Sequence, residues 1–186
     1  MTPRIILLAV ALLMSNITKA EELNIQLSSE TARFMYLTEA FGQNFGRLEL
    51  ETGFLYNENG DSLLNVGVLV RGESVSVPLI VSMGARAYYA DLGASTAVAA
   101  IAIGGDLLLA PESWGGLGIG GFYFIAPGVV SFLDADDLTE YGAYINFQIS
   151  PQASISGGYK RIETSITNAA DVEIDEGGYF GLTISF

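Results

Sequence analysis

The sequence predicts an all-β protein, a closed antiparallel transmembrane β-barrel that follows an export signal. Three observations indicate this fold class: an apolar segment near the N-terminus, an apolar and polar alternation of period two along most of the chain, and an aromatic last residue, Phe186. A period of two is typical of a strand, because successive side chains leave a pleated backbone on opposite faces. A barrel in a membrane turns the apolar face of each strand to lipid and the polar face to its lumen.

Residues 1–20 have the pattern of a secretory signal peptide. Arg4 precedes an apolar run, Ile5–Met14, and a polar segment ends at Ala20, where we expect cleavage. The apolar run is too short for a helix that spans a bilayer. The expected organisation is therefore a signal peptide at 1–20 and one transmembrane barrel at 21–186, in a protein that is exported to the outer membrane of a Gram-negative bacterium.

Composition removes several classes of function. All 21 acidic residues lie in the mature part, which loses two of the 8 basic residues, Arg4 and Lys19, so its formal net charge is −15. Nucleic-acid binding needs basic phosphate contacts and is not expected. The chain has no Cys and no His, so disulfides are absent and zinc sites or a histidine base are not expected. A mean hydropathy of +0.40 beside so many carboxylates indicates that apolar and acidic regions are separated in space.

Eight segments alternate with a period of two and have about the length that a tilted strand needs to cross a bilayer. They are residues 47–56, 63–71, 79–89, 97–109, 117–125, 141–150, 153–161 and 177–186. A barrel with both ends in the periplasm has an even number of strands. The N-terminal segment therefore adds two strands or none. A hairpin of Leu23–Ser28 and Arg33–Phe41, which turns at Ser29–Thr31, makes ten strands, and we favour ten over eight.

The connections alternate between short turns and longer loops. The expected periplasmic turns are 72–76, 111–113 and 150–152, and the expected outer loops are 57–61, 91–95, 127–140 and 164–175. Most acidic residues fall on the outer side: Glu58, Asp61, Asp91, Asp134, Asp136, Asp137, Glu140, Asp171, Glu173, Asp175 and Glu176. Oxygen ligands of this kind could bind Ca²⁺ or Mg²⁺. Their spacing matches no EF-hand loop, so we interpret them as a solvated charged surface and expect no bound metal or other cofactor.

The C-terminal strand resembles the signal by which outer-membrane barrels are recognised for insertion, through Tyr179, Gly181, Ile184 and Phe186. Residues 137–163 and 177–186 together resemble the YfaZ family of outer-membrane β-barrel proteins. The resemblance implies a location and an architecture, and it carries no catalytic or binding residues. The partners it implies are outer-membrane lipid and the barrel-insertion machinery.

The inner faces of the expected strands carry a nearly balanced set of charges. They are Arg47, Glu49, Glu51, Arg71, Arg86, Asp106 and Lys160. In a narrow lumen such groups should pair, because an unpaired buried charge is costly. Inner glycines such as those of residues 115–121 are expected to make room for aromatic rings from neighbouring strands. Aromatic residues near the strand ends are expected to form interface belts: Tyr56, Tyr89, Trp114, Tyr123 and Tyr141.

These patterns predict a barrel with a filled or narrow lumen and a structural or interaction role. Glu49 and Glu51 could be read as an acid and base pair, but Arg47 on the same face makes ion pairing the simpler interpretation, and we expect no enzyme. A small-solute pore is the first alternative. The second is a soluble periplasmic lipid-binding barrel with its apolar faces turned inward, because alternation alone does not say which face meets the solvent.

Overall fold

The computed structural model describes residues 21–43, 46–74, 76–92, 96–166 and 171–186. The expected signal peptide at 1–20 lies outside these residues, so its boundary with the barrel stays a prediction. No helix in the described ranges is long and apolar enough to cross a bilayer.

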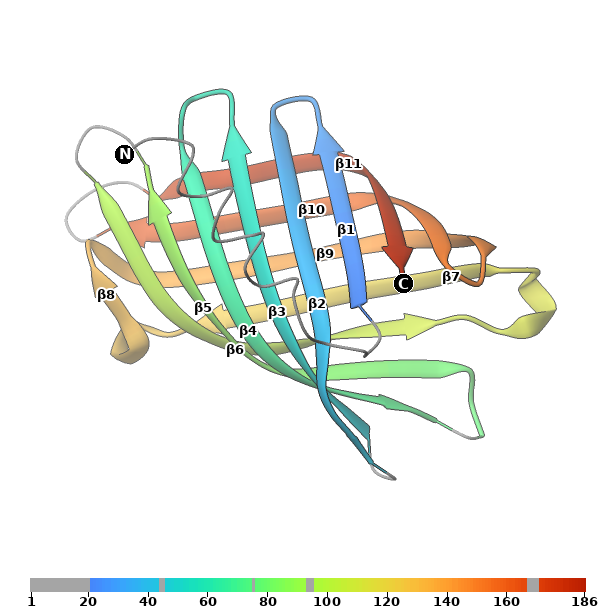
Figure 1. Ribbon diagram of the computed structural model, residues 1–186. Coiled ribbons are helices and arrows are strands. Elements are labelled where there is room, and N and C mark those ends of the chain that lie inside the picture. The colour runs from blue at the N-terminus through green and yellow to red at the C-terminus, as the bar shows by residue number, and fades with distance from the viewer. Residues whose placement is uncertain (1–20, 44–45, 75, 93–95, 167–170) are drawn as a thin grey trace.

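The described residues form ten long antiparallel strands that close into a barrel, with one short extra strand (Figure 1). The strands are β1 (Glu21–Ser28), β2 (Thr31–Gln43), β3 (Gly46–Asn57), β4 (Ser62–Glu73), β5 (Leu79–Asp91), β6 (Ala97–Leu109), β7 (Leu117–Ala126), β8 (Ser131–Leu133), β9 (Ala135–Ser150), β10 (Ala153–Ile166) and β11 (Val172–Ser185). Each long strand pairs with its neighbours in chain order, and β1 pairs with β11 to close the sheet. The predicted fold class and the favoured number of ten strands are confirmed.

The N-terminal hairpin is built as expected, with β1 and β2 in register from the pair Leu27 and Ala32 to the pair Glu21 and Thr38. Its turn is tighter than expected, because Thr31 already belongs to β2. The barrel seam is short, since β1 has only eight residues. Backbone hydrogen bonds in both directions between Glu21 and Phe186, of 3.1 and 2.9 Å, close its end.

Two expected loops are largely strand. The range expected as a loop at 127–140 contains a 3-10 turn (Gly128–Val130), β8 and the beginning of β9. The range expected at 164–175 contains the ends of β10 and β11, and residues 167–170 lie outside the description. β8 pairs with β6 at Val98–Ala100, beyond the end of the pairing between β6 and β7. As a result, Glu140 and Asp175 lie inside the barrel and not on the acidic outer rim where the sequence placed them.

The outer wall is apolar around the barrel. Large side chains that alternate with inner ones stay exposed on every long strand, for example Phe54 on β3, Val68 on β4, Ile103 on β6 and Ile145 on β9. A soluble lipid-binding barrel would bury these side chains and expose the charged face, so the observed orientation contradicts that alternative. It fits a wall that lies in lipid.

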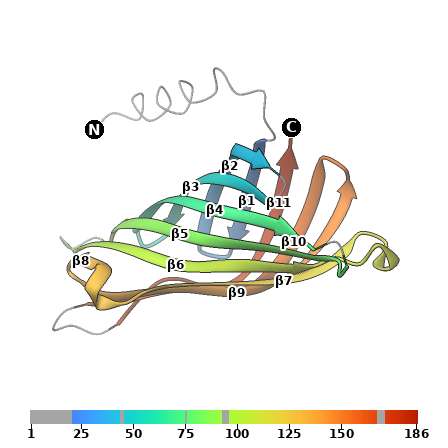
Figure 2. The ribbon, with the colours of Figure 1, turned by 90° about the horizontal axis from the view of Figure 1, so that it is seen from below.

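The two ends of the barrel are different (Figure 2). One end, the terminal end, holds Glu21, Phe186 and the connections 110–116 and 151–152. The opposite end, the loop end, holds β8 and the connections 58–61 and 127–134. In outer-membrane barrels with an even number of strands, the end that holds both termini is the periplasmic one, so an outer-membrane location predicts the terminal end in the periplasm and the loop end at the exterior.

Aromatic residues mark both ends of the wall. Tyr56, Tyr89 and Tyr123 are exposed near the loop end, where the Tyr123 and Tyr141 rings lie 6.4 Å apart. Trp114 belongs to a 3-10 turn (Glu112–Trp114) at the terminal end, so it lies apart from these tyrosines. Rings at both ends are the arrangement expected of aromatic girdles at the two membrane interfaces.

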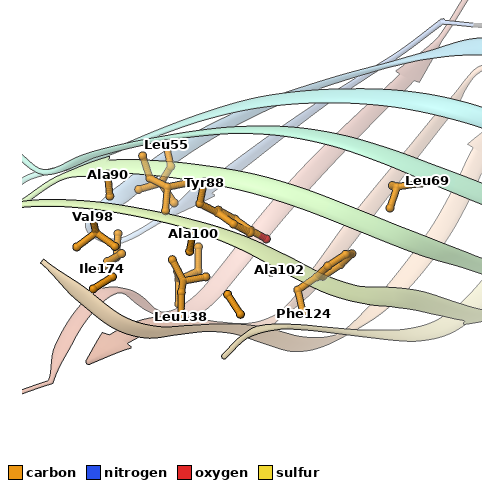
Figure 3. Packing of buried hydrophobic residues seen from close by; sticks show 14 residues of the cluster. Leu55, Leu69, Tyr88, Ala90, Val98, Ala100, Ala102, Phe124, Leu138 and Ile174 are labelled. Atoms are coloured by element: carbon orange, nitrogen blue, oxygen red, sulfur yellow. The ribbon is translucent and has the colours of Figure 1, made fainter. Parts of the chain in front are cut away.

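A cluster of buried apolar side chains fills the loop-end half of the lumen (Figure 3). Its members come from β3 to β7 and from β9 to β11: Leu55, Leu63, Leu69, Tyr88, Ala90, Val98, Ala100, Ala102, Phe124, Ala126, Ala135, Leu138, Ile162 and Ile174. Leu69 lies apart from the others, toward the terminal end (Figure 3). Several are alanines, which fits a narrow space that is filled from opposite walls. The barrel thus has an apolar core at one end of its lumen, and its charged groups lie next to that core.

Candidate functional site: the lumen

Glu140 is the centre of a buried charged layer in the lumen. Its Oε1 atom accepts a hydrogen bond of 2.5 Å from Nη1 of Arg33, and its Oε2 atom accepts one of 3.1 Å from Nη1 of Arg86. The hydroxyl of Tyr88 also donates to Oε2. The carboxylate is 1% exposed and therefore relies on these donors instead of water.

The layer continues from Arg86 to β3. Nη2 of Arg86 donates to Oε2 of Glu51 at 2.8 Å, and Glu51 accepts a second hydrogen bond, of 2.7 Å, from the Asn65 amide. Glu51 and Arg86 flank Gly67 in register, where an added Cβ would approach Arg86 Cγ to 3.1 Å. The missing side chain lets the guanidinium reach across β4. The Cζ atom of the Arg86 guanidinium lies 3.9 Å from the centroid of the Phe124 ring, which is a cation–π contact.

A second buried pair joins β10 to β11. Nζ of Lys160 lies 2.7 Å from Oδ2 of Asp175, and Thr31 donates a hydrogen bond of 3.0 Å to the other oxygen of that carboxylate. Lys160 also lies 5.5 Å from the centroid of the Tyr179 ring. Asp175 continues the inner face of Tyr179 and Gly177, and the register between β10 and β11 shifts just beyond it, so that the extra residue, Ile174, is buried as well. Such a β-bulge breaks the alternation of period two.

The remaining predicted charges lie nearer the terminal end. Nη1 of Arg71 is 3.7 Å from Oε1 of Glu49, and Asp106 accepts a hydrogen bond of 2.9 Å from the Tyr144 hydroxyl. Arg47 pairs with Glu73 at 2.8 Å, and both side chains are substantially exposed at the mouth.

The seven predicted lumen residues therefore do not form one network. Glu51 and Arg86 meet in the central layer, Arg71 and Glu49 meet near the mouth, and the other three, Arg47, Asp106 and Lys160, take partners that the sequence analysis did not select.

Three further charged residues are central to the lumen and were missed: Arg33, Glu140 and Asp175. Arg33 shares one face of its strand with Met35 and Leu37, so that face had no polar character in the sequence. Glu140 and Asp175 fell within expected loops. A signal for Glu140 was present, because it continues by a period of two the inner face of Gly142 and Tyr144, whereas the signal for Arg33 was a lone charge among apolar residues.

Glycines on the inner wall accommodate rings, as the sequence predicted. A Cβ at Gly120 would lie 2.3 Å from the Tyr144 ring, and a Cβ at Gly142 would lie 2.6 Å from the Phe122 ring. The glycine-rich residues 117–121 are therefore a strand that receives a neighbour's aromatic ring. They do not form a phosphate-binding loop, which would require a helix after the glycines.

A cavity of about 450 Å³ occupies the terminal-end half of the lumen, and apolar side chains such as Leu69, Ile80 and Leu108 line it together with polar ones. Its inner end is lined by the charged layer, through Arg33, Glu51, Arg86 and Glu140. Toward the mouth it is lined by amides and hydroxyls, among them Asn24, Gln26, Asn146, Ser154, Ser156 and Thr183. No group of three or more acidic residues in the described ranges is arranged to hold a metal ion.

The four residues of the predicted insertion signal in the C-terminal strand have two different orientations. Tyr179 and Gly181 are buried on the lumen side, whereas Ile184 and Phe186 are exposed on the outer side.

A sheet without free edges can cross a bilayer, because its backbone polar groups find partners within the sheet. The apolar wall meets the remaining requirement, so the protein is an integral β-barrel of the outer membrane. Within that class, the chain belongs to the YfaZ precursor family, whose model matches residues 3–186. The resemblance inferred from residues 137–163 and 177–186 is thereby confirmed.

Two solved structures resemble the chain at low sequence identity. One comes from work on the in-meso crystallisation of membrane proteins, with a TM-score of 0.49 and 12% identity over 90% of this chain and 83% of that chain. The other is the Acinetobacter baumannii outer membrane protein Omp33, with a TM-score of 0.40 and 12% identity over 90% and 97% of the two chains. No curated protein matches the sequence.

Proposed function

We propose that this outer-membrane barrel has a structural or interaction role and does not conduct solutes. The observation that carries the proposal is the layer centred on Glu140, in which side chains from β2, β5 and β9 meet across the lumen. A solute that moved past it would have to break buried ion pairs. It would then enter the apolar cluster, where polar groups of the solute would find no partners.

The same contacts support a barrel without catalytic activity. Glu51 and Glu140 already accept hydrogen bonds from guanidinium groups, so neither is free to act as a general base. The sequence offers no His or Cys to take that role. Glu49 and Glu51, the two carboxylates considered as an acid and base pair, are bound to different cations, Arg71 and Arg86.

The purified protein in a planar lipid bilayer is expected to show no steady conductance. The variant Arg86→Ala should produce a leak, because it removes the guanidinium that joins Glu51 to Glu140 and leaves both carboxylates partly unpaired beside the cavity. Single-channel current recording under a range of voltages measures both effects.

The matched control is Arg47→Ala, which removes a guanidinium from an exposed ion pair at the mouth. We expect this variant, like the unmodified protein, to show no steady conductance. Large, reproducible current steps from the unmodified protein would instead support the small-solute pore. A leak from Arg47→Ala equal to that of Arg86→Ala would show that the central layer is not the seal.

We also propose that the barrel-insertion machinery recognises the end of β11, with outer-membrane lipid around the finished wall. Phe186 supports this because its side chain is 60% exposed at the end of the seam. Deleting Phe186 is expected to lower the amount of folded barrel in the outer membrane and to leave protein in the periplasm. Cell fractionation measures the protein in the outer membrane and in the periplasm. Gel electrophoresis of heated and unheated samples (a heat-shift gel) then separates folded barrel from unfolded protein.

Deletion also removes the backbone bonds between Phe186 and Glu21, so a second variant is needed. Phe186→Ala keeps those bonds and removes only the ring. We expect it to assemble poorly in cells and to refold normally in lipid vesicles, where no machinery is present. Normal assembly of both variants in cells would contradict recognition of the terminal residue, and equal defects in cells and vesicles would assign the ring a purely structural role.

A further inference from the structure

We propose that the terminal-end cavity is a binding site for a small organic cation that carries an ammonium group. The site goes beyond the proposed function, because it lies on the periplasmic side of the sealing layer and does not depend on whether that layer conducts. Its charge, its unpartnered buried oxygen atoms and the spread of its carboxylates over different strands all indicate this ligand chemistry.

The charge of the cavity is negative once its inner end is set aside. In the charged layer, Arg33 and Arg86 balance Glu51 and Glu140. The rest of the lining contains one cation, Arg71, and four carboxylates: Glu22, Glu49, Asp106 and Glu112. A second cavity, of about 390 Å³, shares Glu22, Glu49 and Arg71 with the first. Toward the mouth it adds Glu21, Glu39 and the ion pair of Arg47 with Glu73, so its lining is also acidic overall. Such a concave acidic surface concentrates small cations.

Hydrogen-bond acceptors without partners indicate more than a general electrostatic field. Gln26 and Glu49 are each 8% exposed and line the cavity. Among the described residues, no group donates a hydrogen bond to Oε1 of Gln26, to Oε2 of Glu49 or to Oδ1 of Asn24. Buried polar atoms of this kind normally have a partner in the protein or in a bound molecule. All three are acceptors, which a ligand with N–H or O–H donors would satisfy. Within the described ranges, the lining also carries three unpartnered donors, the Nε atoms of Arg33, Arg71 and Arg86, but each of these guanidinium groups already pairs with a carboxylate through another nitrogen.

An ammonium group fits these acceptors better than a metal ion does. It carries three N–H donors and a positive charge, and it can contact oxygen atoms that are spread over several walls. Gln26 lies on β1 and Glu49 on β3, and the described carboxylates do not gather into a group that could hold a metal ion. A neutral polyol could donate the same hydrogen bonds, but it would gain nothing from the net charge.

Isothermal titration calorimetry of the full barrel in detergent micelles tests the site. The probe is 1,4-diaminobutane, and the control is 1,4-butanediol, a neutral ligand of similar length. We expect saturable binding of the diamine to one site and no measurable binding of the diol. Equal binding of the two would contradict the proposal, as would the absence of saturable diamine binding.

Two variants separate a specific site from a general acidic surface. Glu49→Gln removes one charge with little change of shape, and Gln26→Leu removes an acceptor without changing the charge. Because a hydrogen bond to a charged group contributes strongly, each is expected to weaken diamine binding by about tenfold or more. The control Glu30→Gln removes an exposed carboxylate at the loop end and should leave binding unchanged.

Heat-shift gels establish that each variant is folded before titration. If Gln26→Leu does not fold, Glu49→Gln alone still tests the proposal, because unchanged diamine binding by Glu49→Gln would contradict the proposed site. A further titration uses Mg²⁺ alone. Suppose that Mg²⁺ displaces the diamine at equal concentration and that Gln26→Leu binds the diamine as strongly as the unmodified protein does. The acidic residues would then attract cations without a defined site, and the proposal would be overturned. A conducting barrel that still binds the diamine would contradict only the proposed seal.

Discussion

Glu140→Ala is expected to lower the free energy of unfolding of the barrel by about 3–5 kcal/mol. The change removes the carboxylate that accepts from Arg33 and Arg86, and it leaves Arg33 with only a 3.4 Å contact to Asn65. Arg33 is 1% exposed in the intact layer, so its guanidinium depends on protein acceptors, of which the Glu140 carboxylate is the nearer. A urea titration of the protein refolded in lipid vesicles, followed by tryptophan fluorescence or by heat-shift gels, measures the difference.

The matched control is Glu73→Ala. Glu73 also accepts from an arginine, Arg47, at 2.8 Å, but both side chains of this pair are well exposed. The expected loss is under about 1 kcal/mol, because solvent screens the pair and hydrates the remaining charge. Equal losses in the two variants would mean that burial does not determine the contribution of the Glu140 layer. It would also weaken the case for that layer as the seal.

Ile145→Arg is expected to cost about 2–4 kcal/mol, because it places a charge on the lipid-facing wall. Ile145 is 56% exposed on the outer face of β9, and it lies halfway along that strand between Tyr141 at the outer girdle and Ile149 near the terminal end. This position is near the middle of the apolar band, where the cost of a charge is largest. The same vesicle titration gives the free-energy difference.

The neighbouring substitution Asn146→Arg is the control for the assignment of faces. Asn146 lines the terminal-end cavity, whose acidic lining can accept another guanidinium group. We expect a much smaller change in the free energy of unfolding than for Ile145→Arg. If Asn146→Arg were as costly or more costly, the two faces of β9 would have been assigned the wrong way round.

The wall of this barrel could be predicted almost completely from the sequence. The range 97–109 coincides with β6, and the other seven expected strands each overlap one long strand. The prediction succeeded because lipid on one side and a polar lumen on the other impose a strict alternation on each strand. It failed where strands continue beyond the membrane: β9 begins at Ala135, well before the expected start at Tyr141, because the alternation of apolar and polar residues is weaker there.

The charged lumen was predicted only in part. Alternation places Glu51 and Arg86 on the inner face, but it does not show that Gly67 between them leaves room for contact. The central residue, Glu140, comes from a strand distant in sequence from those of Arg33 and Arg86. Asp175 continues the inner face of β11, but it fell within the expected loop at 164–175, and the register shift just beyond it at Ile174 breaks the period that would have extended the strand.

By itself, the sequence determined that the chain forms a barrel and which residues of most strands share a face, because each strand records its two environments in its own alternation. It also determined that the barrel has no histidine or cysteine chemistry. Only the tertiary structure decided which inner charges meet, that apolar side chains fill the loop-end half, and that a cavity remains at the terminal end. These properties depend on the stagger of strands around a closed sheet, which brings together side chains far apart in the chain and leaves no trace in the pattern of any one strand.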